Sequence, residues 1–103
     1  MKNFNIGFIG LGIMASHMAG YLLKRYKNLN IVERKSIKNK NFIKKFRYIG
    51  NLTIYENYKL LAENSNIIIS CVGNDFNLRE IYLSQNSIID GIKSDSIIID
   101  HTT

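Results

Sequence analysis

The chain of 103 residues contains no proline, no tryptophan and a single cysteine, Cys71. One cysteine excludes an intramolecular disulfide, and no apolar run approaches the roughly 20 residues that a membrane-spanning helix needs. The length is that of one small domain, so the chain cannot hold a complete two-domain enzyme. Apolar residues make up 46% and charged residues 21%, which excludes the disordered and fibrous classes and predicts a globular domain.

Glycine, alanine, arginine and proline are scarce, with 14 residues together, whereas Phe, Tyr, Met, Ile, Asn and Lys supply 55 of the 103. These groups correspond to GC-rich and AT-rich codons, so the composition indicates an AT-rich genome. The formal net charge of +6 then has two explanations, codon bias or an anionic partner such as nucleic acid. We favour codon bias from composition alone, expect no membrane partner, and keep nucleic acid as the alternative.

The N-terminus has some features of a signal peptide, because Lys2 precedes an apolar stretch, residues 6–15, and then small residues. The glycines of this stretch, however, fall at fixed offsets between a predicted strand and a predicted helix, which a plain apolar segment would not require. We therefore expect a protein of the cytoplasm or an organellar matrix that is not secreted.

Hydrophobic patterning predicts strands that alternate with helices along the whole chain. The predicted strands are residues 4–9, 29–32, 52–55, 67–72 and 97–99; the predicted helices are residues 13–27, 37–46, 58–63 and 75–83, with a weak helical turn at 88–92. The sequence therefore predicts a single α/β domain over residues 1–103, with a Rossmann-type, doubly wound, mainly parallel sheet and helices on both faces.

Two of these predictions concern burial. The runs at residues 67–72 and 97–99 are apolar apart from Ser70, which is typical of strands buried on both faces, although the last strand would keep an uncovered flank. The first helix carries apolar residues at a spacing of three to four, which predicts one inward face made of Met14, Met18, Tyr21, Leu22 and Tyr26.

A glycine-rich segment joins the first strand to the first helix and fits the pattern G-x-G-x-x-G/A. Gly10 allows a tight turn, Gly12 lets a pyrophosphate approach the backbone, and Ala15 is small enough for close packing of helix on strand. Backbone N–H groups at the helix start would then face the phosphates. The segment predicts dinucleotide binding by Gly10, Leu11, Gly12, Ile13, Met14 and Ala15; the alternative is a tight turn with no ligand.

The end of the second predicted strand bears on the choice between NAD and NADP. Glu33 lies 21 residues after Gly12, where a carboxylate can accept hydrogen bonds from the ribose hydroxyls of NAD. Arg34 follows and suits the 2′-phosphate of NADP. Between residues 34 and 55 there are seven basic residues and no acidic one, which we expect to lie near the adenosine end of the cofactor. The choice stays open, with a slight preference for NADP.

Other chemistry-bearing residues have simpler explanations. Cys71 lies in a predicted buried strand and is expected to be a small core side chain, and His17 is expected to be exposed or packed on the loop. Asp100 ends a strand, where it either lines a ligand site or caps a turn. We assign no catalytic residue and no metal ligand within the chain.

Three segments resemble the β-hydroxyacid dehydrogenases, a family that includes 3-hydroxyisobutyrate dehydrogenase and tartronate semialdehyde reductase and that is related to 6-phosphogluconate dehydrogenase. The first is residues 7–15 with Met18 and Ala19, the second is residues 71–75 followed by 78–81, and the third is Asp-His-Thr-Thr at 100–103. They occur in the order found in the family and extend over the whole chain. Together they are far more specific than the glycine pattern alone.

The resemblance implies roles for individual residues. Leu11, Gly12, Ile13 and Met14 would bind the pyrophosphate through their backbone. Val72 and Gly73 would line the cofactor beyond the fourth strand, Asn77 would touch it further along, and Thr103 would lie beside the nicotinamide. Arg34 matches the arginine that many NADP-using members place on the 2′-phosphate. Glu33 departs from the usual asparagine and Ala15 from the usual glycine.

The resemblance also implies a reaction, hydride transfer between a nicotinamide and a small hydroxyacid or semialdehyde. The family's catalytic lysine and its helical domain for substrate binding and dimer formation follow the third motif, and no residue here matches that lysine. We therefore expect the chain to bind NAD or NADP without turnover, and leave its status as an enzyme open. The alternative hypothesis is a stand-alone basic module that binds nucleotides or nucleic acid.

Overall fold

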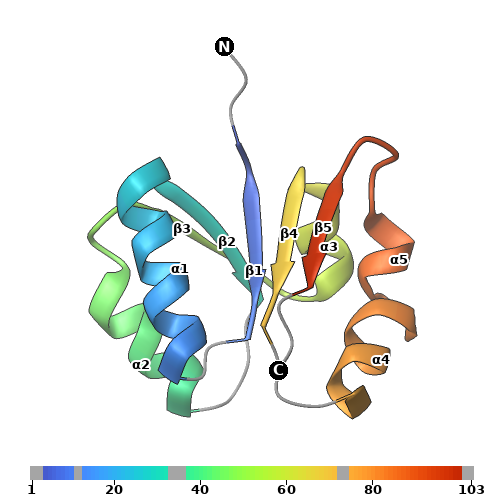
Figure 1. Ribbon diagram of the computed structural model, residues 1–103, viewed down its shortest axis with the longest axis horizontal. Coiled ribbons are helices and arrows are strands. Elements are labelled where there is room, and N and C mark those ends of the chain that lie inside the picture. The colour runs from blue at the N-terminus through green and yellow to red at the C-terminus, as the bar shows by residue number, and fades with distance from the viewer. Residues whose placement is uncertain (1–3, 11–12, 33–36, 72–74, 101–103) are drawn as a thin grey trace.

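The computed structural model describes residues 4–10, 13–32, 37–71 and 75–100, with only the backbone given for residues 13–14, 37–39 and 75–78. Helices and strands alternate along the chain (Figure 1). In order they are β1 (Ile6–Ile9), α1 (Ile13–Tyr26), β2 (Asn28–Val32), α2 (Ile37–Phe46), β3 (Asn51–Tyr55), α3 (Tyr58–Glu63), β4 (Ile67–Ser70), α4 (Asp75–Leu83), α5 (Ile88–Gly91) and β5 (Ile97–Asp100).

The strands form one five-stranded sheet in the order β3-β2-β1-β4-β5, and every neighbouring pair is parallel. Strands β2 and β3 therefore lie on one side of β1. Strands β4 and β5, which come later in the chain, lie on its other side. This is the doubly wound arrangement of a Rossmann-type domain, so the predicted fold class is confirmed. All carboxyl ends of the strands lie at the lower edge of the sheet in Figure 1.

Each face of the sheet has its own hydrophobic core, because successive side chains of a strand point to opposite faces. On one face Ile6 and Phe8 of β1 pack with α1 and α2, and on the other Ile9 packs with α3, α4 and α5. Gly7 also faces α3, so closely that a Cβ atom there would lie 2.5 Å from Cδ2 of Leu61. The central strand is thus enclosed by helices on both sides.

The buried face of α1 differs from the predicted one. Ala15, Ala19 and Leu23 are 3%, 0% and 0% exposed, whereas Tyr21 and Tyr26, which we expected inside, are 65% and 39% exposed. Helix α1 lies close to the sheet and to α2. Because the space between them is narrow, small side chains form the contact face and the largest side chains lie outside it. Met18 and Leu22 pack at the margin of the same core.

Two strands are two residues shorter than predicted, and the other three are one residue longer. Strand β1 begins at Ile6 rather than at residue 4, and Phe4 is 46% exposed with its ring edge-on to Tyr26 at 5.9 Å between centroids. Strand β4 ends at Ser70 rather than at residue 72. The ends of the helices agree with prediction more closely; α1 ends at Tyr26 because Lys27 adopts φ 66°, which lies in the left-handed region.

The prediction that the last strand is buried on both faces is wrong. Ile97, Ile98 and Ile99 of β5 are 57%, 44% and 46% exposed. The strand lies at the edge of the sheet, and its only extensive contact within the described residues is with β4. An apolar run shows that a strand can be buried, but burial itself requires a covering element.

The helices of the described residues were also compared with the length and hydropathy of a membrane span, and none of them meets both requirements.

The register of β4 and β5 offers a direct test of this difference in burial. Ile68 and Ile98 are register partners, yet Ile68 is 0% and Ile98 is 44% exposed. We expect Ile68→Ala to lower the free energy of unfolding by about 2–5 kcal/mol, because it leaves a cavity in the core. Ile98→Ala should cost less than about 1 kcal/mol, since little packing is lost. Urea unfolding followed by circular dichroism measures both, and equal losses would contradict the exposed position of β5.

Candidate functional site

The carboxyl ends of β1 and β4 lie side by side at the centre of the sheet. Ile9 is the register partner of Ser70, and the N–H of Cys71 donates a hydrogen bond to the carbonyl of Ile9 at 2.9 Å. The helix that follows β1 packs on one face of the sheet and the helix that follows β4 on the other. Chain segments therefore diverge at this point, which in open α/β sheets is where ligands bind.

Gly10 directly follows β1 and has a φ angle of 101°, a conformation that side chains other than glycine rarely adopt. Helix α1 begins three residues later, at Ile13. The expectation that Gly10 makes a tight turn between strand and helix is therefore confirmed. Leu11 and Gly12, which were predicted to approach a pyrophosphate, lie outside the described residues.

The N-terminus of α1 points to the same edge of the sheet (Figure 1). Ile13 and Met14 are its first two residues, and the structure gives their helical backbone only. The free N–H groups of a helix N-terminus and its dipole together favour an anion. Ala15 is 3% exposed within the core beneath this turn, as expected for a residue that lets the helix pack closely on the strand.

Most other predicted site residues lie outside the part of the chain whose side chains the structure describes. Glu33, Arg34, Val72, Gly73 and Thr103 lie outside the described residues. Asn77 is the third residue of α4, and its side chain is not described. The strands that precede these segments, β2, β4 and β5, all end at the same edge as β1. The topology is therefore the one that the predicted site requires, and the side-chain roles remain predictions.

Asp100, which ends β5, takes part in a network that the sequence analysis missed. The hydroxyl of Tyr82 on α4 donates to Oγ of Ser70 at 2.8 Å, and Oγ of Ser70 donates to Oδ1 of Asp100 at 3.1 Å. Ser70 is 0% exposed and is the register partner of Asp100. The network ties α4 to the carboxyl ends of two strands. One signal was present in the sequence, because a serine interrupts the apolar run at the position that pairs with Asp100.

The Tyr82 phenol of this network has a raised pKa. Burial raises the pKa of the Tyr82 phenol, and the negative charge of Asp100 raises it further, while the hydrogen bond with Ser70 acts in the opposite direction. Tyr82 is therefore neutral at physiological pH and remains a hydrogen-bond donor. The Asp100 carboxylate receives the hydrogen bond that the Ser70 hydroxyl donates, so its orientation at the sheet edge is fixed from β4.

Three of the basic residues after β2 do not lie where we expected them, near the adenosine end of a cofactor at the carboxyl edge. Helix α2 leads away from the carboxyl edge, and its ten residues extend about 15 Å. Lys44 and Lys45 occupy its last turn, and Arg47 lies beyond it. These three cations are therefore too far away to contact a ligand at the carboxyl edge.

Other candidate groups agree with the simpler interpretations. His17 is exposed on α1, and Cys71 is half-buried against the core of the α1 face. Lys93 is exposed and precedes β5, at the opposite edge of the sheet from Asp100. Cys71 lies at the carboxyl end of β4, and the core contacts of its side chain agree with the expected packing role.

Comparisons with known proteins agree with this geometry. A profile of the NAD-binding domain of 6-phosphogluconate dehydrogenase matches residues 5–103. The chain is 34% identical over 98 residues to an uncharacterized oxidoreductase of Shewanella frigidimarina, and 30% identical over 99 residues to the mitochondrial 3-hydroxyisobutyrate dehydrogenase of Drosophila melanogaster. The matches cover 95% and 96% of this chain but 32% and 28% of those proteins. The chain thus spans about a third of the length of these relatives.

A solved structure described as Psf3 in complex with NADP+ and 2-OPP has the same fold, with a TM-score of 0.78. The sequence identity is 18%, and the likeness covers 95% of this chain and 33% of that one. The fold of the described residues is therefore the fold of about a third of a protein that was solved with NADP+.

The hydrogen-bond network at Ser70 is testable by substitution. Tyr82→Phe and Ser70→Ala should each lower the free energy of unfolding by about 0.5–1.5 kcal/mol, and the double variant should lose less than the sum, because the two share one hydrogen bond. Burial raises the pKa of Tyr82, so its contribution to stability is complete below the unfolded value near 10 and falls as pH rises. The difference in free energy of unfolding between the wild type and Tyr82→Phe should therefore narrow as the pH rises above about 10. Urea unfolding of the wild type and of Tyr82→Phe at each pH measures this difference in free energy.

Tyr55→Phe is the matched control for that experiment, since Tyr55 is also half-buried and packs against the same core cluster but lies outside the network. It should show additive behaviour with Ser70→Ala. Strict additivity of Tyr82→Phe with Ser70→Ala would show that the two side chains do not interact.

Proposed function

The chain belongs to the family of NAD-binding domains represented by 6-phosphogluconate dehydrogenase, and we propose that it binds a nicotinamide dinucleotide across the carboxyl ends of β1 and β4. The observation that carries this proposal is the turn at Gly10. A positive φ angle of 101° at the end of a central parallel strand leads into a helix whose N-terminus faces the point where the two halves of the sheet diverge. This is the geometry that a pyrophosphate requires.

The pyrophosphate would lie over the N-terminus of α1. Backbone N–H groups at Leu11, Gly12, Ile13 and Met14 would donate to its oxygens, while Gly10 shapes the turn and Ala15 keeps the helix close to the sheet. A dinucleotide brings negative charge to this point, and the dipole of a 14-residue helix favours it there. The backbone, rather than charged side chains, would therefore supply most of the contacts to the two phosphates.

The two ends of the cofactor would extend to either side of this turn. Toward β2, the adenosine ribose would meet Glu33 and Arg34, the residues that follow Val32. Toward β4 and β5, the nicotinamide would be lined by Val72, Gly73, Asn77 and Thr103. Asp100 starts the segment that ends at Thr103, and its hydrogen bond from Ser70 would hold the beginning of that segment in place.

We propose NADP as the preferred cofactor. Arg34 can pair with a 2′-phosphate, and the basic residues of the early part of α2 add positive potential at the same end of the sheet. The solved structure with NADP+ that shares this fold is consistent with the proposal. Glu33 opposes it, because a carboxylate at the end of the second strand favours the ribose hydroxyls of NAD.

The reaction that we propose for the whole protein is hydride transfer between the nicotinamide and a small β-hydroxyacid or semialdehyde, by similarity to 3-hydroxyisobutyrate dehydrogenase. The bound cofactor supplies the hydride chemistry, and the protein contributes orientation and exclusion of water. No residue of this chain matches the catalytic lysine of these enzymes. We therefore propose that the 103 residues bind the cofactor but do not turn over substrate.

Titration with NADPH and NADH tests the proposed function. We expect saturable binding of one dinucleotide per chain, tighter for NADPH than for NADH, and weaker binding of both to Gly10→Ala, because alanine is strained at a φ angle of 101°. Arg34→Gln should lower the affinity for NADPH about ten-fold and leave that for NADH nearly unchanged, since it removes a charged hydrogen bond to the 2′-phosphate. Isothermal titration calorimetry gives both dissociation constants.

Arg47→Gln is the matched control, because it removes the same side chain at the far end of α2. It should leave the ratio of the two affinities unchanged. Absence of saturable binding for both cofactors would overturn the proposed function. Tighter binding of NADH, or an unchanged ratio in Arg34→Gln, would overturn the assignment of NADP alone.

A further inference from the structure

The basic residues are concentrated in one part of the chain. Residues 1–55 hold 11 of the 14 basic residues and one of the eight acidic residues, for a formal charge of +10. Residues 56–103 hold three basic and seven acidic residues, for a formal charge of −4. A codon bias raises the lysine content along the whole chain, so it explains neither this asymmetry nor the scarcity of acidic residues in the first half.

The fold brings two basic segments together. Both α1 and α2 begin at the carboxyl edge of the sheet, and their last turns lie toward the other edge (Figure 1). Gly20 of α1 lets the two helices approach, since a Cβ atom there would lie 2.6 Å from Cζ of Phe46. The N–H of Asn51, just after α2, donates to the carbonyl of Lys27 at 2.8 Å. The exposed cations at these ends form the basic cluster, which consists of Lys24, Arg25, Lys27, Lys44, Lys45 and Arg47.

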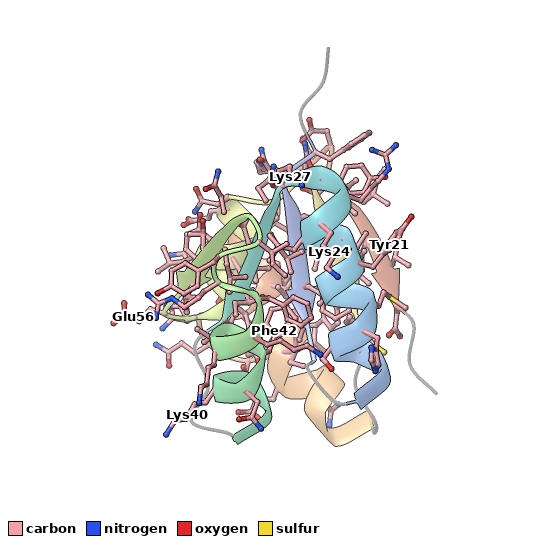
Figure 2. All side chains as sticks on the ribbon, turned by 90° about the vertical axis from the view of Figure 1, so that its left-hand side faces the viewer. Tyr21, Lys24, Lys27, Lys40, Phe42 and Glu56 are labelled. Atoms are coloured by element: carbon pink, nitrogen blue, oxygen red, sulfur yellow. The ribbon has the colours of Figure 1, made fainter. Side chains whose placement is uncertain are left out.

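Exposed tyrosines accompany these cations. Tyr48 is 86% and Tyr26 is 39% exposed; the Arg47 guanidinium lies 5.1 Å from the ring centroid of Tyr48, and that of Arg25 lies 5.5 Å from the ring of Tyr26. Tyr21, 65% exposed, lies three residues before Lys24 on the same helix, as Figure 2 shows. Residues three apart are neighbours on a helix surface. Tyr26 and Tyr48 therefore each have a cation beside the ring, and Tyr21 extends the aromatic surface along α1.

We propose that the basic cluster is a binding site for single-stranded nucleic acid. The cations would contact successive phosphates, and Tyr21, Tyr26 and Tyr48 would stack on unpaired bases. Electrostatic attraction to the phosphates combined with aromatic stacking is the general mode by which proteins hold single strands without reading sequence. A duplex keeps its bases stacked inside and leaves the tyrosines without partners, so the aromatic component favours the single strand.

The same surface is less suited to an anionic membrane. Peripheral membrane helices combine cations with Leu, Phe or Trp side chains that enter the lipid. Most exposed large aliphatic side chains of the described residues lie instead in the acidic half of the chain, at Leu83, Ile89 and β5. The rings within the basic cluster carry a phenolic hydroxyl, which a stacked base tolerates and a lipid tail does not solvate.

The proposed site is separate from the dinucleotide site. Helix α1 has 14 residues and α2 has ten, so they are about 21 and 15 Å long and their last turns lie about 15 and 10 Å from their first turns. The proposed dinucleotide site is at the first turn of α1, and the basic cluster is at the last. Both ligands can therefore bind at once, and this inference does not depend on the proposed cofactor.

A charge-matched pair of variants tests the role of the cations. The probes are 20-nucleotide oligodeoxythymidylate and oligouridylate, each with a fluorescent label, and fluorescence anisotropy is measured from about 50 to 200 mM salt. Lys44→Ala/Arg47→Ala should bind about ten-fold more weakly at the lowest salt, and the slope of log K against log salt should fall by about 1.4, since each contact to a single strand contributes about 0.7. Arg79→Ala/Lys93→Ala loses the same two charges in the acidic half and should bind like the wild type.

A second pair of variants tests the stacking. Tyr48→Phe should retain affinity for the oligonucleotides, because the aromatic face is kept, whereas Tyr48→Ser should lose about five-fold or more. Tyr48 is 86% exposed, so neither change disturbs the core, and circular dichroism verifies that the variants are folded. Equal affinities of Tyr48→Phe and Tyr48→Ser would overturn the stacking component.

Three further measurements decide between the possible ligands and sites. A blunt 20-base-pair duplex should bind more weakly than either single strand, and saturating NADPH should not displace the single strand. Vesicles with 30% phosphatidylserine should bind less than the oligonucleotides at equal phosphate concentration. Equal losses in the two charge-matched variants, displacement by NADPH, or binding to vesicles alone would each overturn the proposal.

Discussion

The parallel pairing of β1 with β4 is the constraint on which the rest of the structure depends. These strands come from opposite halves of the chain, and their register places Ile9 beside Ser70 at the carboxyl edge. The chain then leaves the sheet in two directions, through Gly10 to the helix on one face and through Cys71 to the helix on the other. A crevice at that point follows from topology rather than from any single side chain. The turn at Gly10 and the hydrogen bonds of Ser70 both form at this pair of strand ends.

The two ends of the helices have separate roles in this arrangement. Their first turns offer backbone N–H groups at the carboxyl edge, which suits the compact charge of a pyrophosphate. The last turns of α1 and α2 present side-chain cations and phenol rings, which suits an extended polyanion with exposed bases. A helix C-terminus also favours nearby cations through its dipole, so the basic residues at Lys24, Arg25, Lys44 and Lys45 are in positions that stabilise the helices themselves. The helix dipole thus favours an anion at the first turns and cationic side chains at the last turns.

The sequence was sufficient to predict the order of elements, the parallel sheet and the turn at Gly10, because each depends on local patterning or on one residue's conformational range. It was insufficient for burial and for side-chain hydrogen bonds, because both depend on which helices and strands pack together in the fold. The apolar run of β5 resembles that of β4, yet only β4 has strands on both sides. The contact face of α1 consists of Ala15, Ala19 and Leu23, because closeness to the sheet outweighed side-chain size. The bonds from Tyr82 to Ser70 and from Ser70 to Asp100 cross from a helix to two strands, and no spacing along the chain encodes them.

The separation of charge along the chain has a consequence for its behaviour in solution. With +10 on residues 1–55 and −4 on residues 56–103, the domain carries a large electric dipole in addition to its net charge of +6. The Debye length is about 30 Å at 0.01 M salt and about 8 Å at 0.15 M, so at low salt the field of one molecule extends over a neighbour of similar size. When the basic half of one copy faces the acidic half of another, the attraction between these halves opposes the repulsion between the like net charges. The force between two copies at low salt therefore depends on their mutual orientation, and added salt weakens that dependence.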